Sequence, residues 1–335
     1  MRDLYFEENY GRLYEEIENG ECIVFEFEHS LGTIRHMFIK REIPIQLNGQ
    51  VYYDLITPYG YGGPLVLDYE EGRKRELVHQ FQVAFQQYCK ENNIVSEFVR
   101  FHPIISNAQD FIDCYEVKFL RSTIKTDLSS YEDPILMEYS SSCRRDIRRA
   151  LKEGVEFKVT QNPPDLEKFK ALYYSTMERN QADTYYYFDD IYFSKCLKLF
   201  GEKIVLIEVL YKGRTIGMGL NFIYKKLIHA HLTGTLKEYH HLFPANILQY
   251  GIALWGKEQG FEMVHHGGGR TNRTDDSLYL FKKKFGRNTD FEFYVGEKIW
   301  NEEIYDQLCK KANEVLVTDF FPAYRKKISL EVNKI

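Results

Sequence analysis

The stretch IVLIEVLYKGRTIGMGLNFIYKKLIHAHLT, residues 204–233, contains three apolar runs rich in Ile, Val and Leu. Runs of this kind predict β-strands, and Lys212-Gly213 predicts a hairpin turn between the first two. The pattern then predicts a helix over residues 246–258 and a strand over 261–266 that enters Gly267-Gly268-Gly269. This half of the chain therefore has the order hairpin, strand, loop, helix, strand.

The first half repeats that order without repeating the residues. It contains a predicted hairpin, a strand that enters a glycine-rich loop, a helix and a strand, at residues 22–43, 52–64, 75–91 and 94–103. Further helices are predicted near 166–178, 189–199 and 301–315. Repetition of element order predicts an α/β protein with mixed sheets, built from two tandem domains.

The charged helical segment SSSCRRDIRRALKEG, residues 140–154, joins the two halves. We place the domains at residues 1–145 and 146–335 on this basis. The tail 317–335 is a candidate to pack back on the first domain, and its end LEVNKI is a candidate edge strand.

The composition narrows the class of protein. The 335 residues are 44% hydrophobic, which allows sizeable cores, and include 26 Tyr and 24 Phe, which are suited to lining pockets. The formal net charge is −5. A protein whose main partner is duplex DNA is usually basic, so we expect no DNA partner. A local basic cleft would still allow an RNA-borne substrate.

The six cysteines are scattered and form no C-x-x-C pair, which is typical of reduced thiols in a cytoplasmic protein. The N-terminal segment is charged and lacks the apolar core of a signal peptide. The sequence has no apolar run near the roughly 20 residues that cross a bilayer. We therefore expect no transmembrane segment, with peripheral access to a lipid-linked substrate left open.

Four motifs resemble a known family: EFVRFHP, RDIRRALKEG, GGG and LYLFKKKFG, at residues 97–103, 145–154, 267–269 and 278–286. On these the chain resembles the FemABX-like branch of the GNAT acyltransferase superfamily, and the F-K-x-x-F-G pattern is the most specific of them. The resemblance implies two tandem GNAT-like domains with a substrate cleft between them. It also implies transfer of an aminoacyl group from aminoacyl-tRNA to an amine of a peptidoglycan precursor, although related proteins use other acyl donors.

Two features depart from the family pattern. No heptad segment matches the helical coiled-coil arm that many members carry in the second domain. Members that bind a nucleotide-linked precursor have an Arg four residues before a Tyr; taking Tyr192 as that Tyr, the position holds Phe188. This argues against a nucleotide-linked muropeptide as the acceptor.

The resemblance implies that Lys282, with Phe281 beside it, stabilises charge at the reacting ester. Aminolysis builds negative charge on the carbonyl oxygen, and a fixed cation there lowers the barrier. His231 shares a strand face with His229 and is a candidate general base, the alternative being a hydrogen-bonded, partly buried histidine. Lys283 belongs either to a solvated basic patch or to a contact with donor RNA.

The candidate donor-binding residues are Thr233, Asn246, Gly267, Gly268, Gly269 and Lys283. Splayed neighbouring strands in GNAT-like folds offer backbone groups to the acyl arm, and residues 227–233 and 261–269 would be those strands. The alternative for the glycines is a tight turn. Residues 235–246 lack the glycine-rich loop that usually holds the CoA pyrophosphate, which disfavours ordinary CoA binding without excluding it.

The candidate acceptor-binding residues are Tyr59, Tyr61, Arg100, His102, Arg145, Tyr187 and Tyr192. An aromatic, glycine-hinged loop at residues 57–64 would form part of the acceptor pocket, and Arg100 would suit an anionic group. The alternatives are a structural turn, a salt-bridged Arg, core tyrosines and, for Arg145, a solvated basic helix face.

The leading hypothesis is an N-acyltransferase that forms an amide bond on a cell-wall or surface-glycan precursor. An aminoacyl-tRNA is the expected donor. One alternative is an acyl-CoA-dependent enzyme that acts on an amino sugar or small amine, and another is a non-catalytic binding module with the same fold. We expect no metal site, because no ligand spacing such as HExxH occurs, and no permanently bound cofactor.

Overall fold

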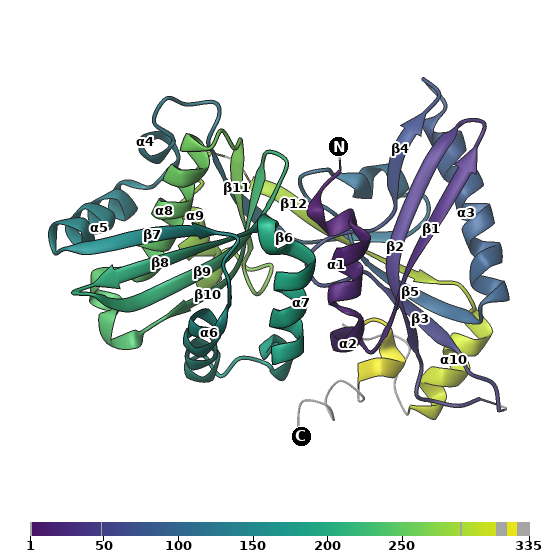
Figure 1. Ribbon diagram of the computed structural model, residues 1–335. Helices are drawn as coiled ribbons and strands as arrows, with labels where there is room; N and C mark the ends of the chain where they lie inside the picture. The colour runs from purple at the N-terminus through teal and green to yellow at the C-terminus, as the bar shows by residue number, and fades with distance from the viewer. Residues whose placement is uncertain (1, 48, 289, 313–319, 327–335) are drawn as a thin grey trace. The chain divides into compact units, whose positions relative to one another are not determined.

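The computed structural model describes residues 2–47, 49–288, 290–312 and 320–326. The chain forms two compact units. The first contains residues 1–120 and 293–335, and the second contains residues 121–292 (Figure 1). Two strands, β6 (Glu116–Asp127) and β12 (Asp290–Ile299), run across the division, so the chain passes from the first unit to the second and back again.

The first unit is a mixed sheet with helices. Its strands follow the order β1 (Gly20–His29), β2 (Gly32–Glu42), β3 (Tyr53–Ile56), β5 (Ile94–Arg100), β12, with β4 (Leu65–Tyr69) paired to β2. The β3–β5 pair is parallel, while β1–β2, β2–β3 and β5–β12 are antiparallel. The helices are α1 (Glu8–Leu13), α2 (Glu15–Glu18), α3 (Lys74–Glu91) and α10 (Glu302–Lys311).

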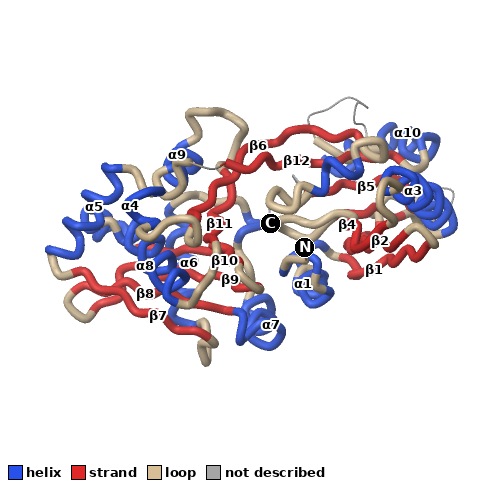
Figure 2. The backbone as a smooth tube through the Cα atoms, turned by 90° about the horizontal axis from the view of Figure 1, so that it is seen from above, coloured by secondary structure: helices blue, strands red, loops and turns tan. Residues whose placement is uncertain are grey.

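Helix α3 provides one side of the first core (Figure 2). Leu77, Phe81 and Phe85 are spaced four residues apart, so they share one helix face and are buried against the sheet. The sheet residues that they meet include Phe38 and Val99. This helix begins and ends within a residue of its predicted range.

The second unit has the strand order β6, β11 (Met263–Gly268), β10 (Leu227–Thr235), β9 (Arg214–Tyr224), β8 (Ile204–Tyr211), β7 (Val155–Gln161). Its helices are α4 (Pro134–Glu138), α5 (Ser141–Lys152), α6 (Glu167–Arg179), α7 (Asp190–Phe200), α8 (Pro244–Glu258) and α9 (Ser277–Lys283). The predicted hairpin, strand, helix and strand of residues 204–268 are all present.

The two faces of this sheet are covered by different helices. On one face, Ile207 and Ile228 pack with Ile252 of α8 and Ile147 of α5. Neighbouring strand residues point to the opposite face, where Phe222 meets Phe200 of α7 at 5.5 Å between ring centres. Helix α6 lies on this face too, where its Phe169 meets Phe193 of α7 at 6.1 Å between ring centres.

The observed division differs from the predicted boundary at 145/146. Helix α5 belongs entirely to the second unit, because its buried side chains Cys143, Ile147 and Ala150 share a core with α8. The first unit in turn regains residues 293–335 after the second unit ends. A single boundary does not describe this chain.

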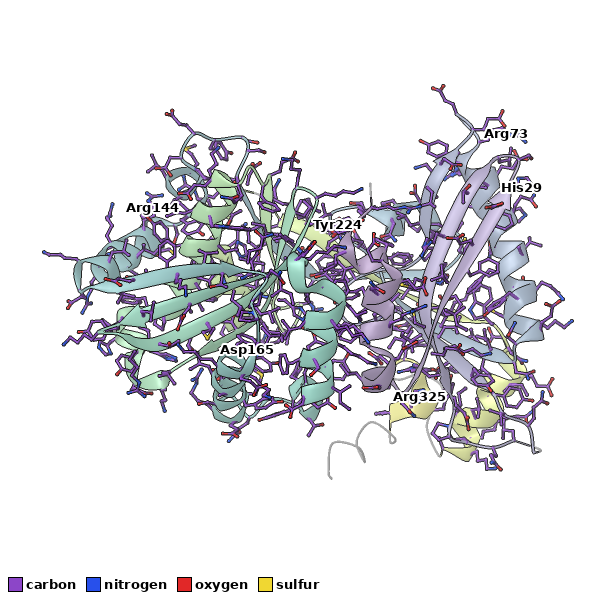
Figure 3. All side chains as sticks on the ribbon, in the orientation of Figure 1. His29, Arg73, Arg144, Asp165, Tyr224 and Arg325 are labelled. Carbon is purple, nitrogen blue, oxygen red and sulfur yellow. The ribbon has the colours of Figure 1, made fainter. Side chains whose placement is uncertain are left out.

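Part of the predicted tail, residues 320–326, packs in the first unit. Tyr324 is buried beside Tyr305 and Val95, and its hydroxyl bonds to Ser96 at 2.7 Å. Arg325, labelled in Figure 3, pairs with the buried Asp54. Residues 317–319 and 327–335, including the predicted edge strand LEVNKI, lie outside the described residues.

Candidate active site

Strands β10 and β11 pair in parallel over three positions and then separate. The paired residues end at His229 with His265. Beyond them β10 stays paired to β9 and β11 to β6, and each pairing contains an irregularity just past the separation point. Strands β10 and β11 are therefore not paired with each other past His229 and His265.

The backbone conformation and the close packing at the end of β11 both favour glycine at residues 267–269. Gly267 has a φ of +72°, in the left-handed region that side chains disfavour. A Cβ on Gly268 would lie 2.8 Å from the Ser122 carbonyl oxygen, and one on Gly269 would lie 2.5 Å from Asp276 Oδ1. The run thus combines an unusual backbone conformation with close packing.

Lys282 reaches this glycine run from helix α9. The helix is capped by Asp276, whose carboxylate accepts from the Tyr279 N–H at 2.9 Å. Lys282 lies in the last turn, and its Nζ donates to the Gly268 carbonyl at 2.8 Å. A cation is therefore held at the end of β11, next to the separated strands.

The F-K-x-x-F-G pattern is explained by what surrounds Lys282. Phe285 is buried, and Phe281 packs against it at 5.0 Å between ring centres. A Cβ on Gly286 would lie 1.8 Å from the Lys125 carbonyl oxygen, so only glycine allows β6 to approach this closely. The two rings and the glycine fix the turn that carries Lys282.

The surroundings lower the pKa of Lys282 to about 8. Desolvation is the main cause, and the Arg121 guanidinium adds to it, whereas Asp276 acts in the opposite direction. Arg121 also donates to the Gly269 carbonyl, so two cations hold consecutive carbonyls. Lys282 remains mostly protonated at pH 7 and can balance developing negative charge.

Two histidines near the separated strands have strongly lowered pKa values, each about 3. Burial is the main cause for both, with His229 adding to the effect on His231 and Lys282 to that on His266. His231 Nε2 lies 2.6 Å from the Tyr192 hydroxyl. His231 is therefore neutral at pH 7 and weakly basic, which is a poor match to deprotonating an ammonium group.

The remaining predicted donor residues lie in the same unit. Thr233 is on β10 past the separation point, and Asn246 is buried in the first turn of α8. Lys283 forms an ion pair with Asp290, which neutralises its charge. Of the lysines at 282 and 283, Lys282 is thus the one that points to the glycine run.

The predicted acceptor residues Tyr61 and His102 of the first unit are buried in an aromatic cluster. His102 and Asp3 are 0% exposed, with Nε2 2.8 Å from Oδ2, and Tyr61 is 8% exposed. The backbone carbonyl of Tyr59 accepts a hydrogen bond from the Tyr10 hydroxyl at 2.8 Å. These contacts pack the loop at residues 57–64 within the first unit, and the role of these residues in binding an acceptor stays a prediction.

Arg100 and the three predicted acceptor residues of the second unit have different environments. Arg100 donates to the Thr57 carbonyl at 2.8 Å. Tyr192 is 2% exposed, stacks on Phe188 at 4.3 Å and holds His231. Tyr187 is 37% exposed, and Arg145 lies on the exposed side of α5. Arg145, Tyr187 and Tyr192 are thus in the unit that carries Lys282.

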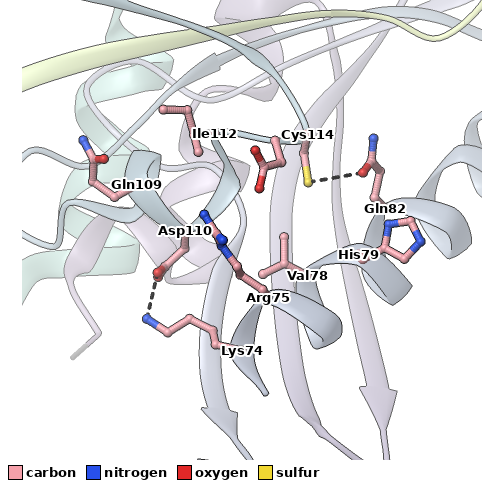
Figure 4. Close-up of a pocket in the computed structure, with 10 residues that line it drawn as sticks. Lys74, Arg75, Val78, His79, Gln82, Gln109, Asp110, Ile112 and Cys114 are labelled. Carbon is pink, nitrogen blue, oxygen red and sulfur yellow. Dashed lines mark hydrogen bonds and ion pairs between the residues drawn. The ribbon is translucent and has the colours of Figure 1, made fainter. Parts of the chain in front are cut away.

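Sequence reasoning missed a pocket of about 320 Å³ in the first unit (Figure 4). It lies between the start of α3 and residues 109–114, and the Lys74–Asp110 ion pair crosses it at 2.7 Å. Burial raises the pKa of the Cys114 thiol there to about 12, so this thiol is unreactive. No motif marked the pocket, because its walls come from separate segments.

Among residues 2–47, 49–288, 290–312 and 320–326, no group of three or more His, Cys, Asp or Glu side chains is arranged to hold a metal ion. Within the same residues, no helix has the length and apolar character to span a bilayer.

Residues 138–275 match the family model of the acetyltransferase (GNAT) domain. The UDP-N-acetylmuramoylpentapeptide-lysine N(6)-alanyltransferase of Weissella viridescens is 26% identical over 195 residues, 57% of this chain. The match spans 56% of that relative's length, so the chain spans about half of the curated relative.

Solved structures show the same fold at lower identity. The crystal structure of FemX has a TM-score of 0.69 and 14% identity, covering 91% of this chain and 94% of FemX. The C-terminal domain of a putative lysylphosphatidylglycerol synthetase from Agrobacterium fabrum has a TM-score of 0.54 and 14% identity, covering 95% of each chain.

The separated strands, the helix α8 that follows β10 and the matched domain model define a GNAT fold. The alanyltransferase relative and the FemX structure support a resemblance of the chain to the FemABX-like branch of the GNAT superfamily. The structure comparison confirms the GNAT-like fold that the sequence motifs predicted.

Proposed function

We propose that this protein is an N-acyltransferase that moves an aminoacyl group from aminoacyl-tRNA to an amine of a cell-wall precursor. The observation that carries the proposal is the Lys282 cation, held at the Gly268 carbonyl where β10 and β11 separate. The curated relative is named as a lysine N(6)-alanyltransferase, which supports a lysine side-chain amine as the acceptor class. Such a donor places the reaction in the cytoplasm and requires no bound cofactor.

The proposed reaction is a direct aminolysis. The neutral acceptor amine attacks the ester carbonyl, a C–N bond forms, the C–O ester bond breaks, and a proton passes from nitrogen to the leaving oxygen. Lys282 stabilises the negative charge that develops on the carbonyl oxygen. Backbone groups at residues 267–269 and along β10 position the donor. Phe188, buried on Tyr192, supplies no cation for a nucleotide phosphate.

The test is transfer itself. The protein would be incubated with a mixture of aminoacyl-tRNAs or with acyl-CoA thioesters, each with nucleotide-linked and lipid-linked lysine-containing precursors, and amide products would be identified by mass spectrometry. We expect product with aminoacyl-tRNA alone. Product with CoA thioesters alone would establish the second candidate, which the GNAT domain match favours. Consumption of neither donor class would favour a binding module.

Arg121→Gln should shift the alkaline side of the pH–rate profile upward. Protonated Lys282 is the active form, so the rate should fall as pH rises through its pKa of about 8. Because the Arg121 charge lowers that pKa, removing it should move the fall to higher pH. The control is Arg273→Gln, an exposed arginine paired with Asp275. A lower rate with an unmoved profile would mean that Arg121 has only a structural role.

A further inference from the structure

The exposed side of helix α5 carries a row of cations. Arg145, Arg148, Arg149 and Lys152 are all exposed and follow the spacing i, i+3, i+4, i+7, which places them on one helix face. The opposite face is buried through Cys143, Ile147 and Ala150. We call these four residues the cationic face of α5. It extends over about 10 Å of helix at 1.5 Å per residue.

Helix α3 shows the contrasting case, in which both signs of charge share one exposed helix surface. Helix α3 carries Lys74, Arg75 and Lys90 together with Glu76 and Glu91. Mixed signs are the usual pattern of a solvated helix. On α5 the single acidic residue is Asp146, which lies outside the row, in a chain whose formal net charge is −5. The cationic face is therefore a local cluster of positive charge on a protein whose net charge is negative.

The start of α5 is fixed to the segment that carries Lys282. The Ser140 N–H, at the helix cap, donates to the Lys284 carbonyl at 2.8 Å. Next to it, the Tyr139 ring packs against Phe285 at 5.3 Å between ring centres. Arg144, labelled in Figure 3, donates to the Leu136 and Tyr139 carbonyls and so braces this junction from outside the row.

The far end of the cationic face lies beside the start of α8. The Arg149 guanidinium is 5.9 Å from the ring centre of Phe243, the residue before that helix. Helix α8 follows β10, one of the two separated strands. The cationic face thus connects the two segments that flank the proposed donor site, both within the second unit.

We propose that the cationic face of α5 binds the phosphate backbone of the donor RNA. The inference rests on the proposed function, since it assigns a surface to the RNA part of an aminoacyl-tRNA. Arginine presents a planar fork of donors that matches phosphate oxygens, and three of the four residues are arginines. Cations at this spacing would hold a short run of phosphates while the aminoacyl ester reaches Lys282.

The test compares Arg148→Gln/Arg149→Gln with the matched control Arg75→Gln/Lys90→Gln on α3. Binding of fluorescent, uncharged tRNA would be followed by anisotropy across a salt series. Each lost phosphate contact should lower the slope of log K against log salt by roughly 0.7–0.9. We expect the α5 variant to bind at least several-fold more weakly with a slope lower by about 1.5, and the control to match the wild type. Equal tRNA binding by both variants would overturn the proposal.

A second measurement separates this inference from the proposed function. Transfer from aminoacyl-tRNA should fall in the α5 variant, whereas transfer from an aminoacyl ester of adenosine, which lacks the RNA, should equal that of the wild type. Equal loss with both donors would overturn the phosphate role. Failure of the wild type to use either donor, with tRNA binding lost only in the α5 variant, would refute the proposed function and leave the RNA surface standing.

A third measurement tests a membrane as the alternative partner. If the α5 variant lost binding to anionic phosphatidylglycerol vesicles while its tRNA binding was unchanged, the face would be assigned to a membrane and the proposal would be overturned.

Discussion

Lys282→Met should reduce the rate of amide formation by ~10²–10³-fold, the usual effect of removing one group that stabilises an oxyanion. The substitution removes the cation at the Gly268 carbonyl and keeps a flexible side chain of similar length. Stability should change little, because desolvation already disfavours the charged amine in the folded state. Single-turnover rates with aminoacyl-tRNA, together with thermal melts, would measure both effects.

The matched control is Lys283→Met. Lys283 is adjacent in sequence but pairs with Asp290, so its loss should leave the rate within a few-fold of the wild type. A similar drop in both variants would point to the general basic character of the segment. A wild-type rate for Lys282→Met would exclude the charge-stabilising role altogether.

Asp54→Ala should destabilise the first unit by ~3–5 kcal/mol, the usual cost of removing one partner from a buried ion pair. Asp54 is 0% exposed and accepts from Arg41 Nε at 2.9 Å, from the Tyr324 hydroxyl at 3.1 Å and from Arg325. Burial alone would raise the pKa of this carboxyl, but Arg41 and Arg325 outweigh it and lower the pKa. Its removal leaves the Arg325 guanidinium without that carboxylate and Arg41 with Glu18 alone, at 3.4 Å.

Urea unfolding followed by tryptophan fluorescence would measure the loss, since Trp300 lies in the first unit. The control is Glu70→Ala, which removes an exposed partner of Arg73 and should leave the unfolding midpoint unchanged. An unchanged midpoint for Asp54→Ala would show that the surrounding groups satisfy each other without the carboxylate.

The apolar runs of the sequence predicted most of the sheet and helices, and they failed for strands of mixed polarity. Strand β6, with the sequence EVKFLRSTIKTD, has charged residues along its length and was not predicted. It nevertheless supplies Arg121, which acts on Lys282, and Thr126, which lies 2.8 Å from His266. Because strand β6 was not predicted, the positions of Arg121 and Thr126 near the candidate site were not predicted either. The alternation of Val117 and Phe119 with Glu116 and Lys118 was the available signal.

The side chains of the candidate site were predictable where a motif fixed them. The F-K-x-x-F-G pattern located Lys282, because both phenylalanines and the glycine have packing roles that the motif records. For Tyr61 and His102, residue type alone suggested a pocket. His102 contacts Asp3 and Tyr61 contacts Tyr5 and Phe293, all far away in the sequence, and no local pattern encodes such partners.

The return of residues 293–335 to the first unit sets an order for folding during synthesis. The second unit, residues 121–292, is one continuous segment that is synthesised before most of β12 and all of α10. The first unit must wait for Tyr324 and Arg325 to reach Asp54, about 270 residues behind them. Domains usually fold from the N-terminus onward as they emerge. Here the later-made unit can finish first, and the earlier-made one stays incomplete, in need of protection from aggregation, until Tyr324 and Arg325 have been made.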